Sequence, residues 1–459
     1  MIIFRMVEEF SLNSREIILD MLLEVEAKNS FSHIIIKDVL DKYDYLEAYE
    51  KKFIKRIFEG VIERKIELDY IISKYAKVKG NKLKPALREI LRMGIYQILY
   101  MDSVPDSAVC NEAVKLVKLK KYYQLTGFVN GVLRNVARDK DNIKYPTKNN
   151  NESMYLSVKY SMPEWIVTQW LSIYSFEVTE KMLIALLEEH NIVVRVNENI
   201  SDCRLKEVIN EWEDKSIIYN AHPYYKYAYE LSNVEGMNKL EGFREGLYTV
   251  QDISSMLVAI VAGIKGDEKV IDICAAPGGK ACHIATRLKE GSIIACDITQ
   301  QKVDKINENI ERLKLHNIEA RVSDATVNNS EWEEQFDILI ADVPCSGLGV
   351  IGKKRDIKYN ASIDKINELV DLQKNIFNNA KKYVKKNGYL IYSTCTISKK
   401  ENEEMVEWIC RSGEFALENI ESYLPKELHG KTSEACYLQL LPGVHKSDGF
   451  FIARMKKIK

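Results

Sequence analysis

Two cysteines, Cys345 and Cys395, each stand shortly after a run of β-branched and aromatic residues that predicts a strand. Residues 336–341 precede the first cysteine, and residues 388–392 precede the second. Because the carboxyl ends of strands in a doubly wound sheet face the ligand crevice, both thiols are expected at that edge. Thiols at a ligand crevice suggest covalent catalysis, in which a thiolate attacks the substrate.

A Gly-rich turn lies between a predicted strand that ends near Asp272 and a predicted helix that begins near Lys280. Gly278 and Gly279 let the backbone come close to a ligand, and the N-terminus of the following helix offers free N–H groups. Eighteen residues after Gly279, another predicted strand ends at Asp297, where a carboxylate can accept both hydroxyls of a ribose. Four acids in all follow predicted strands: Asp272, Asp297, Asp324 and Asp342.

This turn matches neither the G-x-G-x-x-G of dinucleotide enzymes nor the G-x-x-x-x-G-K-[ST] of P-loop proteins. A nucleoside cofactor without a phosphate tail fits better, and S-adenosylmethionine is the common cofactor of that kind. The spaced acids make this interpretation stronger than a lone pair of glycines would.

The elements that must position these motifs fall into three regions. Residues 1–140 are predicted to be helical, because apolar residues recur at three- and four-residue steps, most clearly over 84–100. A polar linker is expected at 141–153, and a small α+β connector domain at 154–240. From 241 to 459 strands and helices alternate, which is typical of a parallel sheet with crossover helices. The predicted fold is therefore multidomain: an all-α helical bundle, a connector and a C-terminal α/β Rossmann-like domain.

Charge and hydropathy narrow the class of protein. The chain has 459 residues and a net charge of −1, yet residues 51–140 hold 20 Lys and Arg against 9 Asp and Glu. This local excess favours nucleic-acid binding, although a solvated helical surface would look the same. No apolar run reaches the ~20 residues of a membrane span, and the apolar residues 1–10 lack the cleavage site of a secretory signal.

The cysteine pattern adds a further limit. The nine cysteines include no Cys-x-x-Cys spacing, so zinc has little support and no metal is expected. Thiols in a chain without an export signal favour a reducing, cytoplasmic location.

Two sets of motifs carry a resemblance to known families. The set Asp272–Lys280, Asp342–Gly347 and Ser393–Thr396 resembles the signature of the RNA 5-methylcytosine methyltransferases. The set Leu91–Gln97, Asn111–Val114 and Phe128–Arg134 resembles the helical RNA-binding domain of the antitermination factor NusB. Two residues depart from the first pattern: Ala281 stands where relatives commonly have Thr, and Arg355 where many have Pro.

The resemblance implies a class I methyltransferase domain that methylates carbon 5 of a cytidine in small-subunit (16S) rRNA. Carbon 5 of cytosine is a poor nucleophile, and a thiolate that adds to carbon 6 makes it a better one. The resemblance assigns the nucleophile to Cys395 and the release step to Cys345, an order that the residues alone leave open. Asp342 is expected to hydrogen-bond the cytosine edge. Lys280 is expected in the same site, where its charge could lower a thiol pKa.

The expected cofactor is S-adenosylmethionine, held by the Gly-rich turn and by acids at strand ends. The expected cofactor-binding residues are Cys274, Ala275, Ala276, Pro277, Gly278, Gly279, Lys280, Asp297, Asp324 and Asp342. The expected partner is small-subunit rRNA, and a monomer without membrane or metal contacts is expected.

Two other functions stay open. A tRNA 5-methylcytosine methyltransferase would use the same chemistry. A non-catalytic RNA-binding or ribosome-assembly factor is a different class, although such a protein need not retain both thiols and all four acids. The tyrosines at 219–229 could stack RNA bases or pack in a core, and His283 is interpreted as a helix residue rather than a ligand or base.

Overall fold

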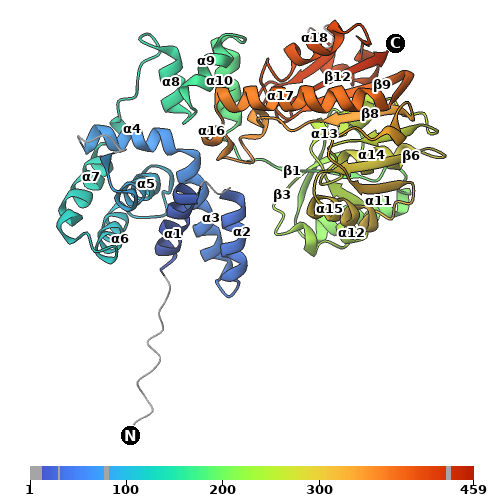
Figure 1. Ribbon diagram of the computed structural model, residues 1–459. Coiled ribbons are helices and arrows are strands. Elements are labelled where there is room, and N and C mark those ends of the chain that lie inside the picture. Colours follow the sequence, from blue (N-terminus) through green and yellow to red (C-terminus); the bar gives the residue numbers. More distant parts are fainter. Residues whose placement is uncertain (1–12, 29–31, 77–81, 431–435) are drawn as a thin grey trace. The chain divides into compact units, whose positions relative to one another are not determined.

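The computed structural model describes residues 13–28, 32–76, 82–430 and 436–459, and its elements are labelled in Figure 1. The apolar residues 1–10, for which no secretory signal was expected, lie outside this part of the chain. The structure divides into two units. One contains the chain up to Leu187 together with residues 351–360, and the other contains residues 188–350 and 361–459. Each unit is described by itself.

The first unit begins with seven α-helices, six of which are grouped around a central one. The outer helices are α1 (Ser14–Lys28), α2 (Ser32–Lys42), α3 (Ala48–Glu63), α4 (Lys65–Tyr75), α6 (Asp106–Leu119) and α7 (Thr126–Asp139). The central helix α5 (Pro85–Tyr100) starts with proline in its first turn, and it is buried almost continuously from Leu87 to Ile98. Such burial on all sides means that α5 is the core of the bundle. The helices predicted here, including the one over 84–100, are confirmed.

Three further helices complete the first unit: α8 (Glu152–Lys159), α9 (Glu164–Leu171) and α10 (Phe176–Ala185). They join the bundle through α4, where the backbone N–H of Ile66 donates to Ser161 Oγ at 2.9 Å. The residues expected to form one connector domain therefore divide between the two units. The helical part up to Leu187 packs with the bundle, and the strands that follow belong to the second unit.

A short segment from the far end of the sequence, residues 351–360, also belongs to the first unit. It contains α16 (Ile357–Asn360). The fully buried Lys358 donates from Nζ to the carbonyl oxygens of Glu63 at 2.7 Å and Ser161 at 2.6 Å. Arg355, one of the departures from the family pattern, forms ion pairs with Glu59 and Glu63 of α3. Both basic side chains thus anchor the segment to the helical bundle.

The second unit is built on an eight-stranded sheet in the order β10-β12-β9-β8-β5-β6-β7, with β11 paired to β12. The parallel strands are β5 (Lys269–Asp272), β6 (Ser292–Asp297), β7 (Ile318–Val322), β8 (Phe336–Asp342) and β9 (Val384–Thr394). The antiparallel strands are β10 (Phe415–Leu417), β11 (Tyr437–Leu440) and β12 (Phe450–Lys457). The chain order reverses between β5 and β8, so the ligand crevice of this sheet is expected there.

Helices cover both faces of the large sheet (Figure 1). Helices α13 (Ile253–Val261), α14 (Gly279–Arg287) and α15 (Gln300–Arg312) share one apolar core with the sheet, and α17 (Ile363–Ala380) and α18 (Glu403–Arg411) share the other. Successive residues of β5 face opposite cores, with Val270 on one side and Ile271 on the other. The predicted α/β domain with crossover helices is confirmed.

A smaller antiparallel sheet precedes the large one in the same unit, in the order β2-β3-β1-β4. Its strands are β1 (Ile192–Val196), β2 (Ile218–Ala221), β3 (Ala228–Ser232) and β4 (Tyr248–Val250). The buried Trp212 of α11 (Asp202–Asp214) packs against the rings of Tyr219, Tyr229 and Tyr248. Tyr219 and Tyr229, two of the tyrosines at 219–229, are therefore core contacts of this sheet.

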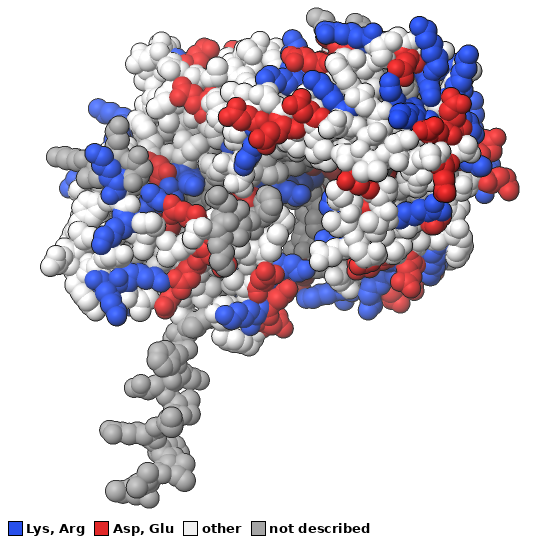
Figure 2. Space-filling model, in the orientation of Figure 1, with Lys and Arg blue, Asp and Glu red and all other residues white. Residues whose placement is uncertain are grey.

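Two surface properties complete the description. Over the described residues, no helix combines the length and the apolar character needed to cross a membrane. On the face drawn in Figure 2, Lys and Arg side chains are interspersed with Asp and Glu rather than gathered in one continuous patch.

Two glycines in contact join the loop after Cys345 to the loop before β12. The N–H of Gly349 donates to the carbonyl oxygen of Cys395 at 3.1 Å, and the N–H of Gly449 donates to that of Gly349 at 2.9 Å. A Cβ on Gly349 would collide with the carbonyl oxygen of Gly449. Only glycine therefore allows the backbone approach that fixes the Cys395 carbonyl.

We expect Gly349→Ala to lower the unfolding free energy by about 2 kcal/mol, because the added methyl group forces these backbones apart. The matched control is Gly131→Ala on α7, where a Cβ would meet no atom within 4 Å. The control should be neutral or slightly stabilising, since alanine favours helix. Calorimetric melting of both variants measures the difference, and equal melting temperatures would contradict the prediction.

Candidate active site

The predicted site residues gather at one edge of the large sheet. Asp272, Asp297 and Asp342 are the last residues of β5, β6 and β8, and Cys395 directly follows β9. These four strands are parallel, so their carboxyl ends meet at the same edge. The structure thus brings residues more than a hundred positions apart in the sequence to one crevice.

The two thiols face each other across this edge. Cys345 Sγ and Cys395 Sγ are 3.4 Å apart, although fifty residues separate them in the sequence. The hydrogen bond with Cys395 and burial together raise the pKa of Cys345. Because the two sulfur atoms lie this close together, both can reach the same bound group.

A buried acid that sequence reasoning missed, Glu401, holds the loop that carries Cys345. Its carboxylate accepts from the Ser346 N–H at 2.8 Å and from Ser346 Oγ at 2.6 Å. Gln373 Nε2 donates to the carbonyl oxygen of Pro344 at 2.9 Å on the other side of the cysteine. Burial raises the pKa of Glu401, against the effect of these hydrogen bonds.

A second missed residue, Asn402, brackets Cys395. Thr394 Oγ1 donates to Asn402 Oδ1 at 2.6 Å, and Asn402 Nδ2 donates to the carbonyl oxygen of Thr396 at 3.0 Å. Asn402 is fully buried, so these hydrogen bonds fix the backbone on both sides of the thiol. The available sequence signal was the pair of polar residues 401–402 before the amphipathic run of α18.

Lys280 and Asp342 form an ion pair in the crevice. Lys280 Nζ lies 2.7 Å from Asp342 Oδ2, and Ser393 Oγ donates to the other carboxylate oxygen at 2.7 Å. Burial alone would lower the pKa of Lys280, but the charge and hydrogen bond of Asp342 raise it. Lys280 is thus a fixed positive charge beside the thiols, and the charge of Cys395 acts on it as well.

The Gly-rich turn is held close to the end of β6. Gly278 has a φ of 101°, which favours glycine, and a Cβ there would lie 3.2 Å from the side chain of Ile306. The N–H of Ala276 donates to Asp297 Oδ2 at 3.0 Å, and the N–H of Ala275 donates to the carbonyl oxygen of Cys296 at 2.8 Å. The N-cap of α14 is Gly278, which has no side chain to cap the first turn, so the N–H groups there are open to a ligand as far as the described residues show.

Asp324 and Asp272 complete the set of four acids. Asp324 follows β7, and hydrogen bonds from the hydroxyl and N–H of Thr326 lower its pKa. Asp272 is completely buried, and within the described residues its Oδ2 has no hydrogen-bond partner. Burial, and next the charge of Asp342, raise the pKa of Asp272 to about 7.

These residues fit a cationic nucleoside cofactor. The unpartnered Asp272 oxygen, the acid at the end of β6 and the uncapped N-terminus of α14 offer acceptors and donors for an amino acid and a ribose. Within the described ranges, no three His, Cys, Asp or Glu side chains come together as a metal site. Fold and site together define a class I methyltransferase.

Comparison with known proteins identifies the family. Residues 259–456 match the model of the 16S rRNA methyltransferase RsmB/F family, and residues 12–138 match the NusB family. A probable ribosomal RNA small subunit methyltransferase B of Bacillus subtilis is 34% identical over 453 residues, which cover 96% of this chain and 98% of the relative. The chain therefore belongs to the RsmB/F family of S-adenosylmethionine-dependent methyltransferases. The expected family, fold and cofactor are confirmed.

Other relatives agree with this assignment. A probable ribosomal RNA small subunit methyltransferase B of Synechocystis is 30% identical, over 97% of this chain and all of the relative. The crystal structure of PH0851 superposes with a TM-score of 0.77 at 26% identity, over 97% of this chain and 98% of that one. The structure of NSun6 from Pyrococcus horikoshii with SFG has a TM-score of 0.56 at 22% identity, over 65% of this chain and 98% of that one, which shows a shared fold.

The buried Asp272 predicts a measurable pH dependence of stability. Its pKa is about 7 in the folded protein and ~4 in an unfolded chain. Because the folded-state pKa is raised, the contribution of Asp272 is complete below pH ~4 and is lost as the pH rises through ~7. Between pH 5 and 7.5 the wild type should therefore lose about 2.5 kcal/mol of unfolding free energy relative to Asp272→Asn.

Urea unfolding at the two pH values, without cofactor, measures this difference. The control is Asp267→Asn, at an exposed position before β5, which should show no such pH-dependent gap. A constant difference between wild type and Asp272→Asn at both pH values would contradict the prediction.

Proposed function

We propose that the protein transfers a methyl group from S-adenosylmethionine to carbon 5 of a cytidine in small-subunit rRNA through a covalent adduct with Cys395. The observation that carries the proposal is the pair of thiols 3.4 Å apart beside the ion pair of Lys280 and Asp342. A methyltransferase that acts on a nucleophilic nitrogen or oxygen needs no thiol, whereas carbon 5 must first be activated.

In the proposed methyl transfer, the bond and proton transfers to and from the base are assigned to residues of this site. The Cys395 thiolate forms a bond to carbon 6, and the electron pair of the 5,6 double bond becomes available at carbon 5. A cofactor held at the Gly-rich turn would supply an electrophilic methyl group, which carbon 5 would take while the methyl–sulfur bond breaks and its electron pair stays on sulfur. Asp342, oriented by Lys280 and Ser393, is placed to hydrogen-bond the amino group and to share a proton with N3 of the base, and that proton would offset the negative charge that develops on the ring. Cys345 must be in its thiolate form at this step, having given its own proton to solvent; it then takes the proton from carbon 5, and the bond to Cys395 breaks with re-formation of the double bond.

Small-subunit rRNA is the substrate that the comparisons favour. The two curated relatives are named for the small subunit, and the N-terminal region matches the NusB family. Exposed basic residues on α3, such as Lys52, Lys55 and Arg56, provide positive charge for a phosphate backbone. An rRNA substrate would place the activity in the cytoplasm, and a monomeric state stays a prediction.

Substitution of the two thiols tests the chemistry. Cys395→Ala should abolish methyl transfer, because no adduct can form. Cys345→Ala should accumulate a covalent protein–RNA adduct, visible as a band of reduced mobility on a denaturing gel, because release of the adduct is blocked. The control is Cys203→Ala on the exposed surface of α11, which should behave like the wild type. An adduct with Cys395→Ala instead would reverse the two roles.

The substrate is tested by transfer of a labelled methyl group to unmodified small-subunit rRNA, to tRNA and to small ribosomal subunits, followed by nucleoside analysis. We expect labelled 5-methylcytidine from the rRNA, either free or in the subunit. Label in tRNA alone would favour the tRNA alternative. Cofactor binding without label in any RNA would favour the non-catalytic assembly factor.

A further inference from the structure

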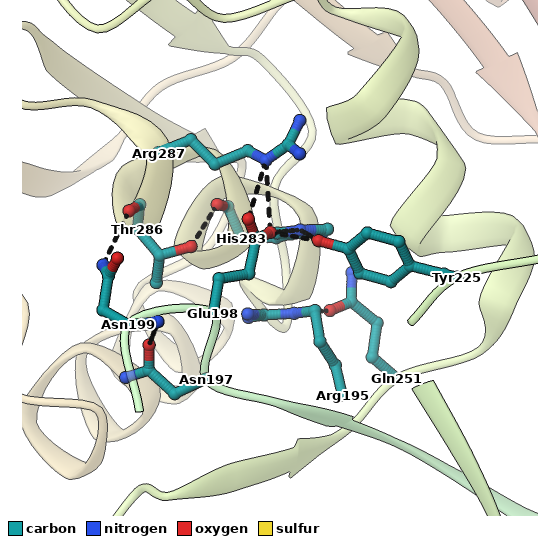
Figure 3. A network of polar contacts seen from close by, with 9 residues as sticks. All are labelled: Arg195, Asn197, Glu198, Asn199, Tyr225, Gln251, His283, Thr286 and Arg287. Atoms are coloured by element: carbon teal, nitrogen blue, oxygen red, sulfur yellow. Dashed lines mark hydrogen bonds and ion pairs between the residues drawn. The ribbon is translucent and has the colours of Figure 1, made fainter. Parts of the chain in front are cut away.

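Helix α14 contacts the active site with one end and the small sheet with the other. Its first residues, Gly279 and Lys280, belong to the cofactor turn and to the ion pair with Asp342. One turn later, the fully buried ring of His283 points toward Glu198 in the loop after β1 (Figure 3). The position of α14 thus sets where the cofactor turn lies, and the small sheet is its second support.

At the contact between α14 and the small sheet, three side chains bind the same carboxylate, that of Glu198 (Figure 3). His283 Nε2 lies 2.7 Å from Glu198 Oε1, and Arg287 Nε donates to both carboxylate oxygens at 3.1 and 3.2 Å. The hydroxyl of Tyr225 donates to the same carboxylate. The next residue in the sequence adds a contact to the backbone of α14, because Asn199 Nδ2 donates to the carbonyl oxygen of Thr286 at 3.2 Å.

A second pair of side chains from the small sheet reaches the other end of α14. Arg195 Nε donates to Gln251 Oε1 at 2.8 Å, and both side chains are buried. The Gln251 side chain lies 3.9 Å from the position that a Cβ on Gly279 would occupy. The small sheet and its loops therefore contact α14 beside the Gly-rich turn and again about two helical turns later at Arg287.

Charge makes Glu198 the centre of this arrangement. Burial would raise the pKa of Glu198, but hydrogen bonds from His283 and Tyr225 and the charge of Arg287 lower it to about 2. Burial and the charge of Arg195 lower the pKa of His283 to about 3, so its ring is neutral and donates from Nε2 to the carboxylate. Without the negative charge of Glu198, the cations Arg195 and Arg287 would lie close together without compensation.

We infer that Glu198 is a positioning residue for methyl transfer: through His283 and Arg287 it holds α14 against the small sheet and thereby places Gly279 and Lys280 for the cofactor. The inference rests on the proposed binding of the cofactor at the Gly278–Gly279 turn. Helix α14 is continuous from Gly279 to Arg287, so a shift of its C-terminal end after loss of the contacts at Arg287 should also displace its N-terminal end. A displacement of ~1 Å at reacting groups can cost ~100-fold in rate.

The test is Glu198→Gln in the full-length protein, which keeps the size of the side chain and removes its charge. We expect the dissociation constant of S-adenosylmethionine, measured by calorimetry, to rise by about 10- to 100-fold. The KM for the cofactor should rise in parallel, while the KM for RNA stays unchanged. The matched control is Glu207→Gln on α11, an exposed carboxylate that pairs with Arg204 and should leave all these values unchanged.

One further variant and one further measurement keep the test decisive. Arg287→Gln, at a partly exposed position, should raise the dissociation constant in the same direction by a smaller factor, and it serves if Glu198→Gln does not fold. Hydrogen exchange of the α14 amides should speed up in both variants. Native cofactor affinity and KM in a folded Glu198→Gln protein, with only a lower melting temperature, would overturn the inference and leave Glu198 a structural residue.

A parallel measurement on Asp297→Asn separates this inference from the proposed function. If Asp297→Asn weakens cofactor binding and Glu198→Gln does not, the cofactor site stands and the inference fails. If neither variant changes binding, the proposed placement of the cofactor fails as well. Weaker binding in both supports the two together.

Discussion

The partly buried ion pair between Lys280 and Asp342 is the interaction on which the active-site edge depends. Lys280 comes from the start of α14 and Asp342 from the end of β8, so their 2.7 Å contact joins this helix to the strand that leads to Cys345. Taking two charges out of water is costly unless each gains further partners. Asp342 gains the hydroxyl of Ser393 from β9, next to Cys395, and so the pair also ties in the second thiol. The ion pair and this hydrogen bond together link α14, β8 and β9 at the active-site edge.

The electrostatics of the crevice follow from this pair. Lys280 neutralises Asp342, and the nearby Asp272 is left with a buried oxygen that has no partner in the described structure. Its raised pKa shows that a second negative charge is unfavourable there without compensation. A cationic ligand would supply that compensation. An edge with more acids than bases therefore suits a cofactor that carries a sulfonium and an ammonium group, and this charge balance is independent of the motif resemblance.

The sequence predicted the site residues at the ends of the strands, but it missed the residues that hold the neighbouring loops in place. Each of Asp272, Asp297 and Cys395 stands at the end of an apolar run, and parallel pairing alone brings such ends together. Glu401 and Asn402 sit in a polar stretch whose partners lie up to fifty-five residues away, and no local period marks them. Glu198 was missed for the same reason. His283 was correctly interpreted as a helix residue, yet only the packing of α14 on the small sheet shows which group its ring contacts.

The supports of the two thiols differ, and the difference bears on their roles. Three hydrogen bonds fix the backbone at Cys395. Asn402 binds Thr394 on one side and Thr396 on the other, and the N–H of Gly349 donates to the carbonyl oxygen of Cys395. A nucleophile must approach one face of one carbon atom, so a rigid backbone favours that task. Cys345 is held in a loop through the neighbouring Ser346 and Pro344, which leaves its own peptide group less constrained. A group that removes a proton after the methyl transfer must follow carbon 5 as its geometry changes from planar to tetrahedral. The stiffer support of Cys395 therefore favours it as the nucleophile, on grounds that the sequence motifs alone did not provide.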